Sequence, residues 1–286
     1  MNAAALATSG ELAKSLATPG DTRDFPIRNS HLKAMAKSAA HCRHAILNNS
    51  ESSLSKRLGS GVHSLLLGGQ PVLMYPGKQR KGKDFDLWLK DKPGDALVYL
   101  RKEYERAHGI ANAIKSDRLA SQVLFAPGTI YEQTILWDWL GRKRRCTPDA
   151  RTASHLVDLK TTRNASPEKF RWDVIRFGYH AQMADYANAI ETSTGVRPRD
   201  IYIVAVETIE PYPVVTYRLT PNDLEQGERL VHSWMERLLI CEATGDWPGY
   251  SEAIVDLDLP DPDGMSFDFD DDGERADVDL TATDEE

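Results

Sequence analysis

Two acidic residues and one lysine stand in two segments that the pattern predicts to be neighbouring strands. Asp149 ends the segment Arg142–Asp149, and Asp158 and Lys160 stand two positions apart in the segment His155–Thr162. Side chains at i and i+2 of a strand share a face, so Asp158 and Lys160 are expected to point the same way. A hairpin that pairs the two segments can place the Asp149 carboxylate beside that of Asp158.

Two carboxylates held together repel each other, and a hard divalent cation with oxygen ligands relieves the repulsion. In a site that handles phosphate groups this cation is most often Mg²⁺. A lysine on the same face can then stabilise an attacking hydroxide or the negative charge of a phosphoryl transition state. An Asp-x-Lys pattern on an exposed strand is also a common surface ion pair, so the rest of the chain has to support the chemical interpretation.

The hydrophobic pattern predicts an α/β fold in which helices flank a central mixed, mostly antiparallel sheet. A period of two predicts strands, the first three as an antiparallel meander, over Ile130–Trp137, Arg142–Asp149, His155–Thr162, Asp200–Thr208 and Val214–Leu219. A helical period predicts helices over Asn29–Asn48 with Ser30 as its cap, Leu58–Leu67, Gly94–Leu119, Arg171–Thr192 and residues 221–243. The basic run Lys78–Lys83 predicts a loop.

Composition is that of a globular protein, with 286 residues of which 41% are hydrophobic and 27% are charged. No segment reaches the roughly 18 uninterrupted apolar residues of a membrane helix, and the first 20 residues do not form a targeting signal. Cys42, Cys146 and Cys241 are far apart, which argues against a disulfide framework or a cysteine-built metal site. We therefore expect a cytoplasmic protein without membrane contact.

Charge is distributed unevenly along the chain. Residues 251–286 contain 15 acidic residues and the single base Arg275, whereas the other 250 residues carry 34 bases and 28 acids. This pattern predicts a poorly ordered arm over residues 1–25, one folded domain over 26–250 and a disordered acidic tail over 251–286. The mildly basic body is compatible with a nucleic-acid partner, and the tail could mimic DNA by occupying a basic surface.

Several motifs accompany the acidic pair. Pro148-Asp149 followed by Asp158-Leu159-Lys160 resembles the PD-(D/E)xK nuclease superfamily. Gly59 to His63 and Gln182-x-x-x-Tyr186 resemble elements of its RecB-like branch, and Glu132 occupies the place of an additional acid. From about residue 27 to residue 250, where Asp246-Trp247-Pro248 is a further match, the chain most resembles the RecE-type exonucleases of prophage recombination systems. The acidic tail and the run Lys78–Lys83 have no counterpart in this resemblance.

The resemblance implies a restriction-endonuclease-like core and a role for each matched residue. Asp149 and Asp158 would bind Mg²⁺, or Mn²⁺ as a substitute, with His63 completing the ligand set. Glu132 would bind the ion directly or orient its water, and Lys160 would assist the nucleophilic water. Tyr179, Gln182 and Tyr186 share one stripe of a helix, and Gln182 and Tyr186 would position a carboxylate, a phosphate or the cleaved strand. Without the resemblance, His63, Glu132, Gln182 and Tyr186 read as ordinary packing or surface residues.

The implied function is an exodeoxyribonuclease that acts on the ends of double-stranded DNA. It would degrade one strand from 5′ to 3′ and leave 3′ single-stranded DNA for a single-strand annealing protein, and related enzymes form homo-oligomeric rings. A restriction-like or repair endonuclease and a non-cleaving DNA-binding module are the alternatives. Basic residues can neutralise DNA phosphates, and the expected contacts are Lys78, Arg80, Lys81, Lys83 and Arg163, with the cluster Arg142 to Arg145 as a second candidate or a solvated face.

Overall fold

The computed structural model describes residues 20–48 and 54–257. Contacts divide the chain into residues 1–250 and 251–286, and every helix and strand of the described residues lies in the first unit. The strands are β1 (Val72–Tyr75), β2 (Leu97–Leu100), β3 (Ile130–Tyr131), β4 (Ile135–Trp139), β5 (Arg142–Cys146), β6 (Ala150–Arg151), β7 (His155–Thr162), β8 (Asp200–Glu207) and β9 (Val214–Arg218).

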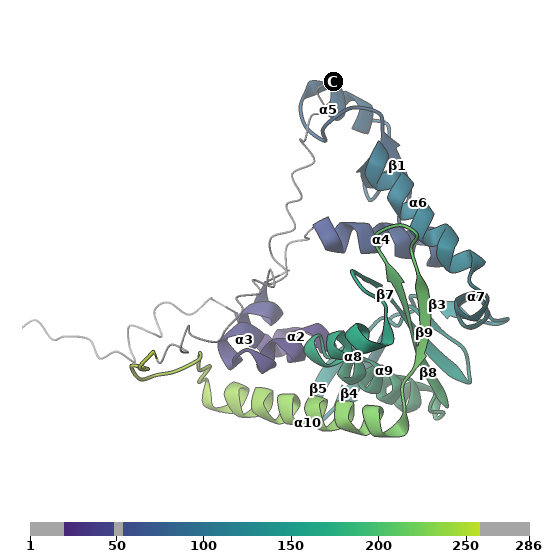
Figure 1. Cartoon of the computed structure of the whole chain (residues 1–286). Helices are drawn as coiled ribbons and strands as arrows, with labels where there is room; N and C mark the ends of the chain where they lie inside the picture. Colours follow the sequence, from purple (N-terminus) through teal and green to yellow (C-terminus); the bar gives the residue numbers. More distant parts are fainter. Residues whose placement is uncertain (1–19, 49–53, 258–286) are drawn as a thin grey trace, which may run out of the picture. The chain divides into compact units, whose positions relative to one another are not determined.

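Helices precede, separate and follow these strands along the chain (Figure 1). They are η1 (Thr22–Asp24), α2 (Asn29–Lys33), η2 (Ala34–Ala36), α3 (Ala39–Leu47), α4 (Leu54–Leu67), α5 (Lys83–Leu89), α6 (Arg101–Ser116), α7 (Arg118–Leu124), α8 (Pro167–Arg176), α9 (Tyr179–Thr194) and α10 (Pro221–Thr244). None of the described helices has both the length and the apolar character that crossing a bilayer requires.

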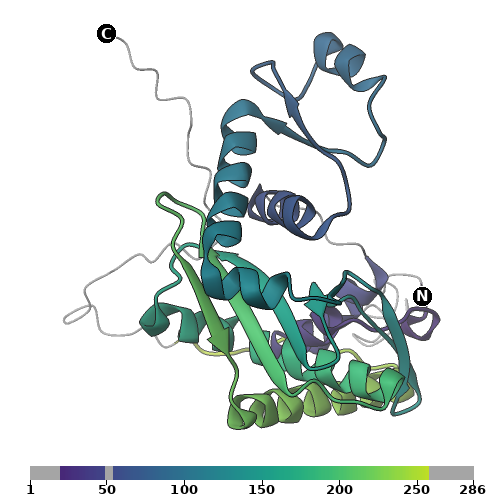
Figure 2. The ribbon, with the colours of Figure 1, turned by 90° about the vertical axis from the view of Figure 1, so that its right-hand side faces the viewer.

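A five-stranded mixed sheet forms the centre of the first unit, in the order β3-β6-β7-β8-β9 (Figure 2). Strands β7 and β8 pair in parallel, and the other neighbouring strands pair antiparallel. Parallel neighbours need a crossover connection, which α8 and α9 supply between β7 and β8. The predicted fold class, a mixed and mostly antiparallel sheet flanked by helices, is confirmed.

Strand β7 is buried on both faces because helices cover each side of the sheet. Val157 and Leu159 belong to a core formed with α4, α6 and α7. Leu156 belongs to a second core, formed with α8 and α9. Since successive side chains of a strand alternate between its faces, Asp158 and Lys160 share the α9 side with Leu156.

The predicted meander is wrong in its pairing. Strand β5 pairs with β4 in a separate two-stranded sheet and forms a single bridge with Ile27, whereas the short strand β6 pairs with β7. The expected strand Ile130–Trp137 is interrupted at Glu132, whose φ of 44° lies in the left-handed region. Such a residue ends extended pairing, so the segment divides into β3 and β4.

Three predicted helices also differ from the structure. Within the expected helix Gly94–Leu119, residues Leu97–Leu100 instead form β2, which pairs in parallel with β1. A short apolar run such as this suits a strand or a buried helix equally well, so periodicity alone cannot decide between them. Helix Arg171–Thr192 is instead α8 and α9, separated by Gly178 with a φ of 63°. The segment Asn29–Asn48 forms α2, η2 and α3.

The predicted arm over residues 1–25 lies outside the described residues up to residue 19, and its part Thr22–Asp24 forms η1. Thr22 is buried, and its hydroxyl donates a 2.7 Å hydrogen bond to Glu242 of α10. Helices α2 and α3 pack with α10 in a third hydrophobic core. The predicted cap Ser30 is wrong, because it lies within α2, whose N-cap is Arg28. Ser38 caps α3 by accepting a 3.2 Å hydrogen bond from the His41 N–H.

Helices α9 and α10 approach closely at Gly227, where an added Cβ would lie 2.5 Å from the His180 carbonyl oxygen. Alanine normally favours a helix over glycine by about 0.5–1 kcal/mol, but here the methyl group would overpack against backbone at a cost of about 1–3 kcal/mol. We expect Gly227→Ala to lower the free energy of unfolding in a urea titration. Gly249→Ala, whose Cβ meets nothing within 4 Å, is the control. A Gly227→Ala variant as stable as the wild type would contradict this packing.

Candidate active site

Asp158 and Lys160 form an ion pair on the α9 side of β7. The Lys160 Nζ lies 2.6 Å from the Asp158 Oδ2, and the Asp158 side chain is only 2% exposed. Burial by itself would lower the pKa of Lys160, but the Asp158 and Asp149 carboxylates raise it, and the net shift is upward. Lys160 is therefore a positive charge at neutral pH.

Asp149 lies beside this pair because of the β6–β7 hairpin. Its neighbour Ala150 pairs with Val157, and the Asp149 Oδ2 accepts a 2.7 Å hydrogen bond from the Leu159 N–H. Burial raises the pKa of the Asp149 carboxyl and Asp158 raises it further, whereas His63 and Lys160 act in the opposite direction. The structure thus places the Asp149 carboxylate next to β7, within the electrostatic influence of Asp158.

His63 reaches the same place from α4. Its Nε2 lies 3.0 Å from the Leu159 carbonyl oxygen, and its Nδ1 lies 3.6 Å from the Asp149 Oδ1. When Nε2 carries the proton and donates it to the carbonyl, the lone pair of Nδ1 faces the Asp149 carboxylate and can bind a cation. The structure thus brings together residues that are 96 positions apart in the sequence.

Glu132 borders the site from the turn after β3. Its N–H donates a 3.1 Å hydrogen bond to the Asp149 carbonyl oxygen. Burial raises the pKa of the Glu132 carboxyl, while His63 lowers it and Asp149 raises it. These influences show that the Glu132 carboxyl belongs to the electrostatic surroundings of His63 and Asp149.

Helix α9 adds a polar stripe above the ion pair. Gln182 donates a 3.0 Å hydrogen bond to the Asp158 Oδ1, and its Oε1 accepts one of 3.4 Å from Lys160. The Lys160 Nζ also lies 4.8 Å from the centre of the Tyr179 ring. Tyr186 is partly buried. Its pKa is raised well above the usual value, mainly by burial and further by the negative charges of Asp158 and Asp149. Gln182 therefore orients both the acid and the lysine.

The carboxylate oxygens of Asp149 and Asp158 are ligands of the kind that a hard cation prefers. The Asp158 Oδ2 is buried and has no hydrogen-bond partner among the described residues, although the Lys160 ammonium approaches it as an ion pair. The described residues contain no group of three or more His, Cys, Asp or Glu side chains already arranged around a metal position. The carboxylates of Asp149 and Asp158, with His63 and Glu132 nearby, are the residues that would hold the ion.

A recess of about 310 Å³ opens beside Gln182 and Tyr186. Arg28, Lys33 and Arg145 contribute to its lining, so it brings positive charge next to the acidic site. The sequence assigned no role to Arg28 or Lys33, because their segment comes close to α9 only in the folded chain.

Two arginines of the expected basic surface are instead buried. The Arg144 side chain is 0% exposed and lies 2.7 Å from Asp185 of α9, and Arg142 pairs with Glu242 of α10 at 3.0 Å. Both arginines alternate along β5 with the more exposed Lys143 and Arg145. This alternation is visible in the sequence, but the acidic partners have no local signal. The idea that Arg142 and Arg144 form a solvated or DNA-binding face is wrong.

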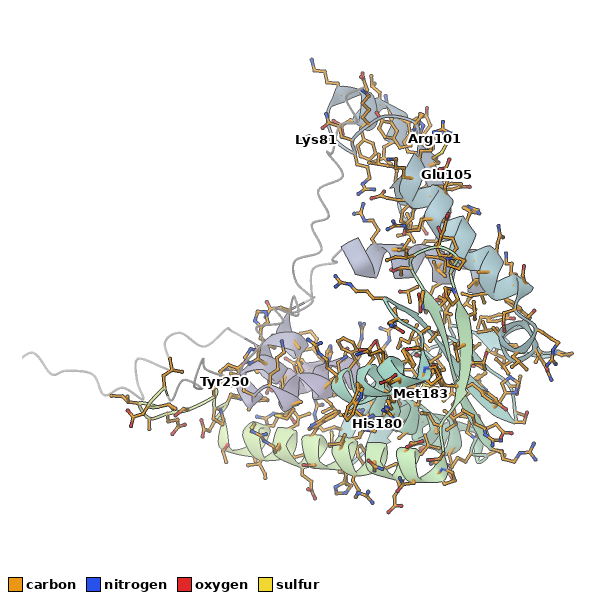
Figure 3. The ribbon with its side chains drawn as sticks, viewed as in Figure 1. Lys81, Arg101, Glu105, His180, Met183 and Tyr250 are labelled. Carbon is orange, nitrogen blue, oxygen red and sulfur yellow. The ribbon has the colours of Figure 1, made fainter. Side chains whose placement is uncertain are left out.

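The other expected DNA contacts lie outside the acidic site. Lys78 and Lys81 are exposed in the loop after β1, Lys83 is the first residue of α5, and Arg80 pairs with Glu103 of α6. Figure 3 shows Lys81 far from His180 and Met183 of α9. Arg163 is exposed directly after β7. In the described residues, the hydrogen bonds and ion pairs at the acidic site involve none of these five side chains.

A mixed sheet that presents two carboxylates and a lysine beside a hairpin defines a PD-(D/E)xK-like fold and site. The chain belongs to the family described as "PDDEXK-like domain of unknown function (DUF3799)", which matches residues 29–258. Family, fold and site together support a nuclease.

One solved structure shares this fold over nearly its whole length. It is a crystal structure from Eubacterium rectale named "Putative exonuclease", with a TM-score of 0.60 and 16% sequence identity over 90% of this chain and 97% of that chain. A second, named SSO0001, covers 42% of this chain and 55% of its own at 15% identity with a TM-score of 0.27, which supports no conclusion. No curated protein matches the chain significantly.

The buried Arg144–Asp185 pair predicts a large loss of stability when it is broken. Arg144→Met leaves the Asp185 carboxylate buried without its partner, so we expect the free energy of unfolding to fall by about 3–5 kcal/mol. The double variant Arg144→Met/Asp185→Leu should recover much of this loss, because both charges are removed. Arg199→Met, at a side chain that is 84% exposed, is the control. Urea denaturation measures all three, and a single variant within about 0.5 kcal/mol of the wild type would show that the pair is unimportant.

Proposed function

We propose that this chain is a Mg²⁺-dependent exodeoxyribonuclease that acts on the ends of double-stranded DNA. The observation that carries the proposal is the convergence of Asp149, Asp158 and Lys160 at one desolvated point of a PDDEXK-like fold. Acidic pairs with a neighbouring ammonium suit phosphodiester hydrolysis, in which negative charge accumulates on the reacting phosphate.

Each residue of the site has a part in this reaction. Asp149 and Asp158 would hold the cation, with His63 and Glu132 as further candidate ligands. Mn²⁺ would replace Mg²⁺ because both ions bind carboxylate and water oxygens. When bound, the ion polarises the scissile phosphate and makes water a better nucleophile. Lys160 remains protonated and stabilises the developing negative charge, while Gln182 holds the side chains of Asp158 and Lys160 in position. Tyr186 borders the recess that adjoins Gln182.

Basic residues near the site support a DNA substrate. Arg28, Lys33 and Arg145 line the recess beside Gln182, where they can contact phosphates of the strand that reaches Lys160. Lys78, Lys81 and Lys83 with Arg80, and Arg163 after β7, supply further contacts. Phosphate contacts of this kind position the DNA without reading its sequence, as expected of an enzyme that acts on any end.

The proposed polarity is 5′ to 3′, so that the product is 3′ single-stranded DNA for a single-strand annealing protein in recombination. A homo-oligomer, such as a ring that encloses the DNA, would make the degradation processive. These points follow the RecE-type resemblance of the motifs. A restriction-like or repair endonuclease of the same superfamily is the second candidate, because the same acids and lysine also serve internal cleavage.

Cleavage of end-labelled DNA tests the proposal. With Mg²⁺ and a linear duplex, the wild type should release a 5′ label before a 3′ label. Asp158→Ala and Lys160→Ala should reduce the rate at least about 100-fold, because the first removes a carboxylate that would hold the cation and the second removes the positive charge that stabilises the transition state. Asp138→Ala and Lys143→Ala, at exposed positions of the β4–β5 hairpin, are matched controls and should cleave normally.

The same assay separates the alternatives. Cleavage of a closed circular duplex at the rate of a linear one would identify an endonuclease. Binding without cleavage of either substrate would identify a non-cleaving module. Full activity of Asp158→Ala or Lys160→Ala would remove these residues from the chemistry.

The exposed lysines after β1 predict the salt dependence of DNA binding. Each phosphate contact contributes about 0.9 to the slope of log K against log salt concentration. Lys78→Gln/Lys81→Gln/Lys83→Gln should therefore flatten the slope by up to about 3, whereas Lys115→Gln on α6 should leave it unchanged. Fluorescence anisotropy with a labelled duplex at several salt concentrations gives the slopes. An unchanged slope in the triple variant would remove this loop from the DNA path.

A further inference from the structure

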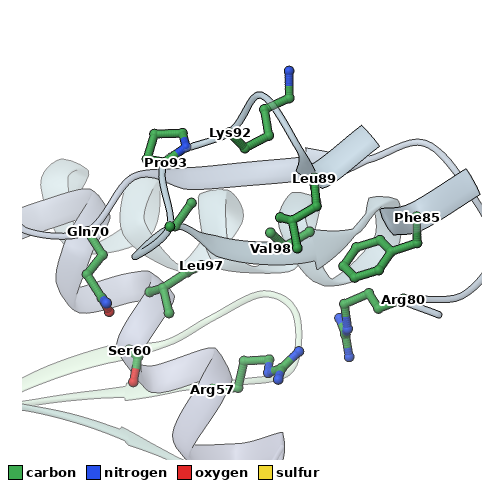
Figure 4. Close-up of a pocket in the computed structure, with 12 residues that line it drawn as sticks. Arg57, Ser60, Gln70, Arg80, Phe85, Leu89, Lys92, Pro93, Leu97 and Val98 are labelled. Carbon is green, nitrogen blue, oxygen red and sulfur yellow. The ribbon is translucent and has the colours of Figure 1, made fainter. Parts of the chain in front are cut away.

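A pocket of about 720 Å³ lies between α4 and the segment from β1 to β2, outside the acidic site (Figure 4). Its size is that of a small-molecule site. Helix α4 forms one side with Arg57, and the opposite side comes from Arg80, Phe85 of α5 and the β2 residues Leu97 and Val98. One hydrogen bond and one ion pair hold these sides in place. The Tyr99 hydroxyl donates a hydrogen bond to the Arg57 carbonyl oxygen, and Arg80 forms an ion pair with Glu103.

The pocket combines an apolar wall with positive charge. Phe85, Leu97 and Val98 provide flat apolar surface, and Figure 4 shows Arg57 and Arg80 extending toward the same gap from opposite sides. Among the described residues that line the pocket, none is acidic. Glu103, behind Arg80, offsets only one of the two guanidinium charges. A ligand that fits must therefore carry both an apolar, planar part and an anionic part.

The pocket is linked to the acidic site through α4. Arg57 precedes His63 by six residues on this helix, which corresponds to about 9 Å along its axis. A Cβ on Gly59, between them, would lie 3.4 Å from the Thr161 hydroxyl, so α4 packs against β7 one residue beyond Lys160. A strand whose phosphate lies at Lys160 can therefore follow α4 to Arg57.

We propose that this pocket binds an unpaired nucleotide of the substrate strand. Its phosphate would contact Arg57 and Arg80, and its base would pack against Phe85, Leu97 and Val98. The inference rests on the proposed function, because it assumes that DNA lies at the acidic site. A double helix, whose major groove alone is about 12 Å wide, is larger than a pocket of about 720 Å³, so the bound nucleotide belongs to a strand separated from its partner.

Binding of this kind gives a nuclease a preference for frayed ends. Base contacts with apolar and aromatic side chains are worth about 1–3 kcal/mol per base and tolerate any sequence. An end that already has unpaired nucleotides avoids the cost of separating the strands. The β1–α5–β2 segment thus adds a single-strand site to the general electrostatic attraction of the body for DNA.

Equilibrium binding in EDTA tests the pocket without cleavage. Fluorescence anisotropy would measure the full chain with three labelled probes: a single strand, its blunt duplex, and a single strand in which abasic residues replace the nucleotides. The wild type should bind the abasic strand about tenfold more weakly than the normal strand, because the charge is equal and only base contacts are lost.

Two variants separate the apolar wall from the charge. Ala96→Trp fills the pocket at a lining position and should abolish the difference between normal and abasic strands while leaving duplex binding within about twofold. Arg57→Gln should weaken both single strands and keep their ratio. Arg101→Gln, a 65% exposed side chain on α6, is the control for general charge. Thermal melting confirms that each variant is folded. If Ala96→Trp is unfolded, Phe85→Ala replaces it and should reduce the ratio of the affinities for normal and abasic strands at least about twofold.

The outcomes distinguish this inference from the proposed function. Equal binding of normal and abasic strands by the wild type would overturn the proposal that the pocket binds a nucleotide. An Ala96→Trp variant that keeps the tenfold ratio would overturn it as well. Competition by a free deoxynucleoside monophosphate as effective as that by the oligonucleotide would also overturn it, because the site would then serve a free nucleotide. Failure of the proposed function would appear separately, as absent cleavage of the linear duplex in Mg²⁺.

Discussion

The repulsion between two carboxylates in a desolvated place is the constraint that organises this molecule. Asp149 and Asp158 lie together because β6 and β7 form a hairpin, and burial raises the pKa of Asp149. Lys160 and the Gln182 amide stabilise Asp158, and the Leu159 N–H stabilises Asp149. The compensating groups come from β7 and α9, so the sheet and its crossover helices have to be in place before the site can exist.

Buried ion pairs away from the acids fix the elements that carry this site. Arg144 joins β5 to Asp185 on α9, one turn from Gln182, and Arg142 joins β5 to Glu242 on α10. Breaking such a pair leaves an uncompensated buried charge, which is far more costly than losing a surface pair. The basic character of β5 therefore serves the orientation of α9, and only the alternate, outward side chains are available to a substrate.

Helix α4 connects the acidic site to the segment from β1 to β2. One helix carries His63 toward the acids and Arg57 toward the pocket of about 720 Å³. The two residues are separated by about 9 Å along the axis of this helix. The family match and the shared fold define the core, and the pocket of this segment lies outside the acidic site.

The sequence by itself determined the features that depend on local periodicity. The alternation of a strand placed Asp158 and Lys160 on one face, and the helical stripe of Tyr179, Gln182 and Tyr186 was correctly expected to share a face. Only the tertiary structure decided that Leu97–Leu100 forms a strand, that β5 leaves the central sheet, and that Arg142 and Arg144 are buried. A short apolar run fits two kinds of element, and the burial of an arginine depends on a carboxylate supplied from a distant part of the chain. Neither strand pairing nor such a partner leaves a local pattern, because both are set by which surfaces meet when the chain folds.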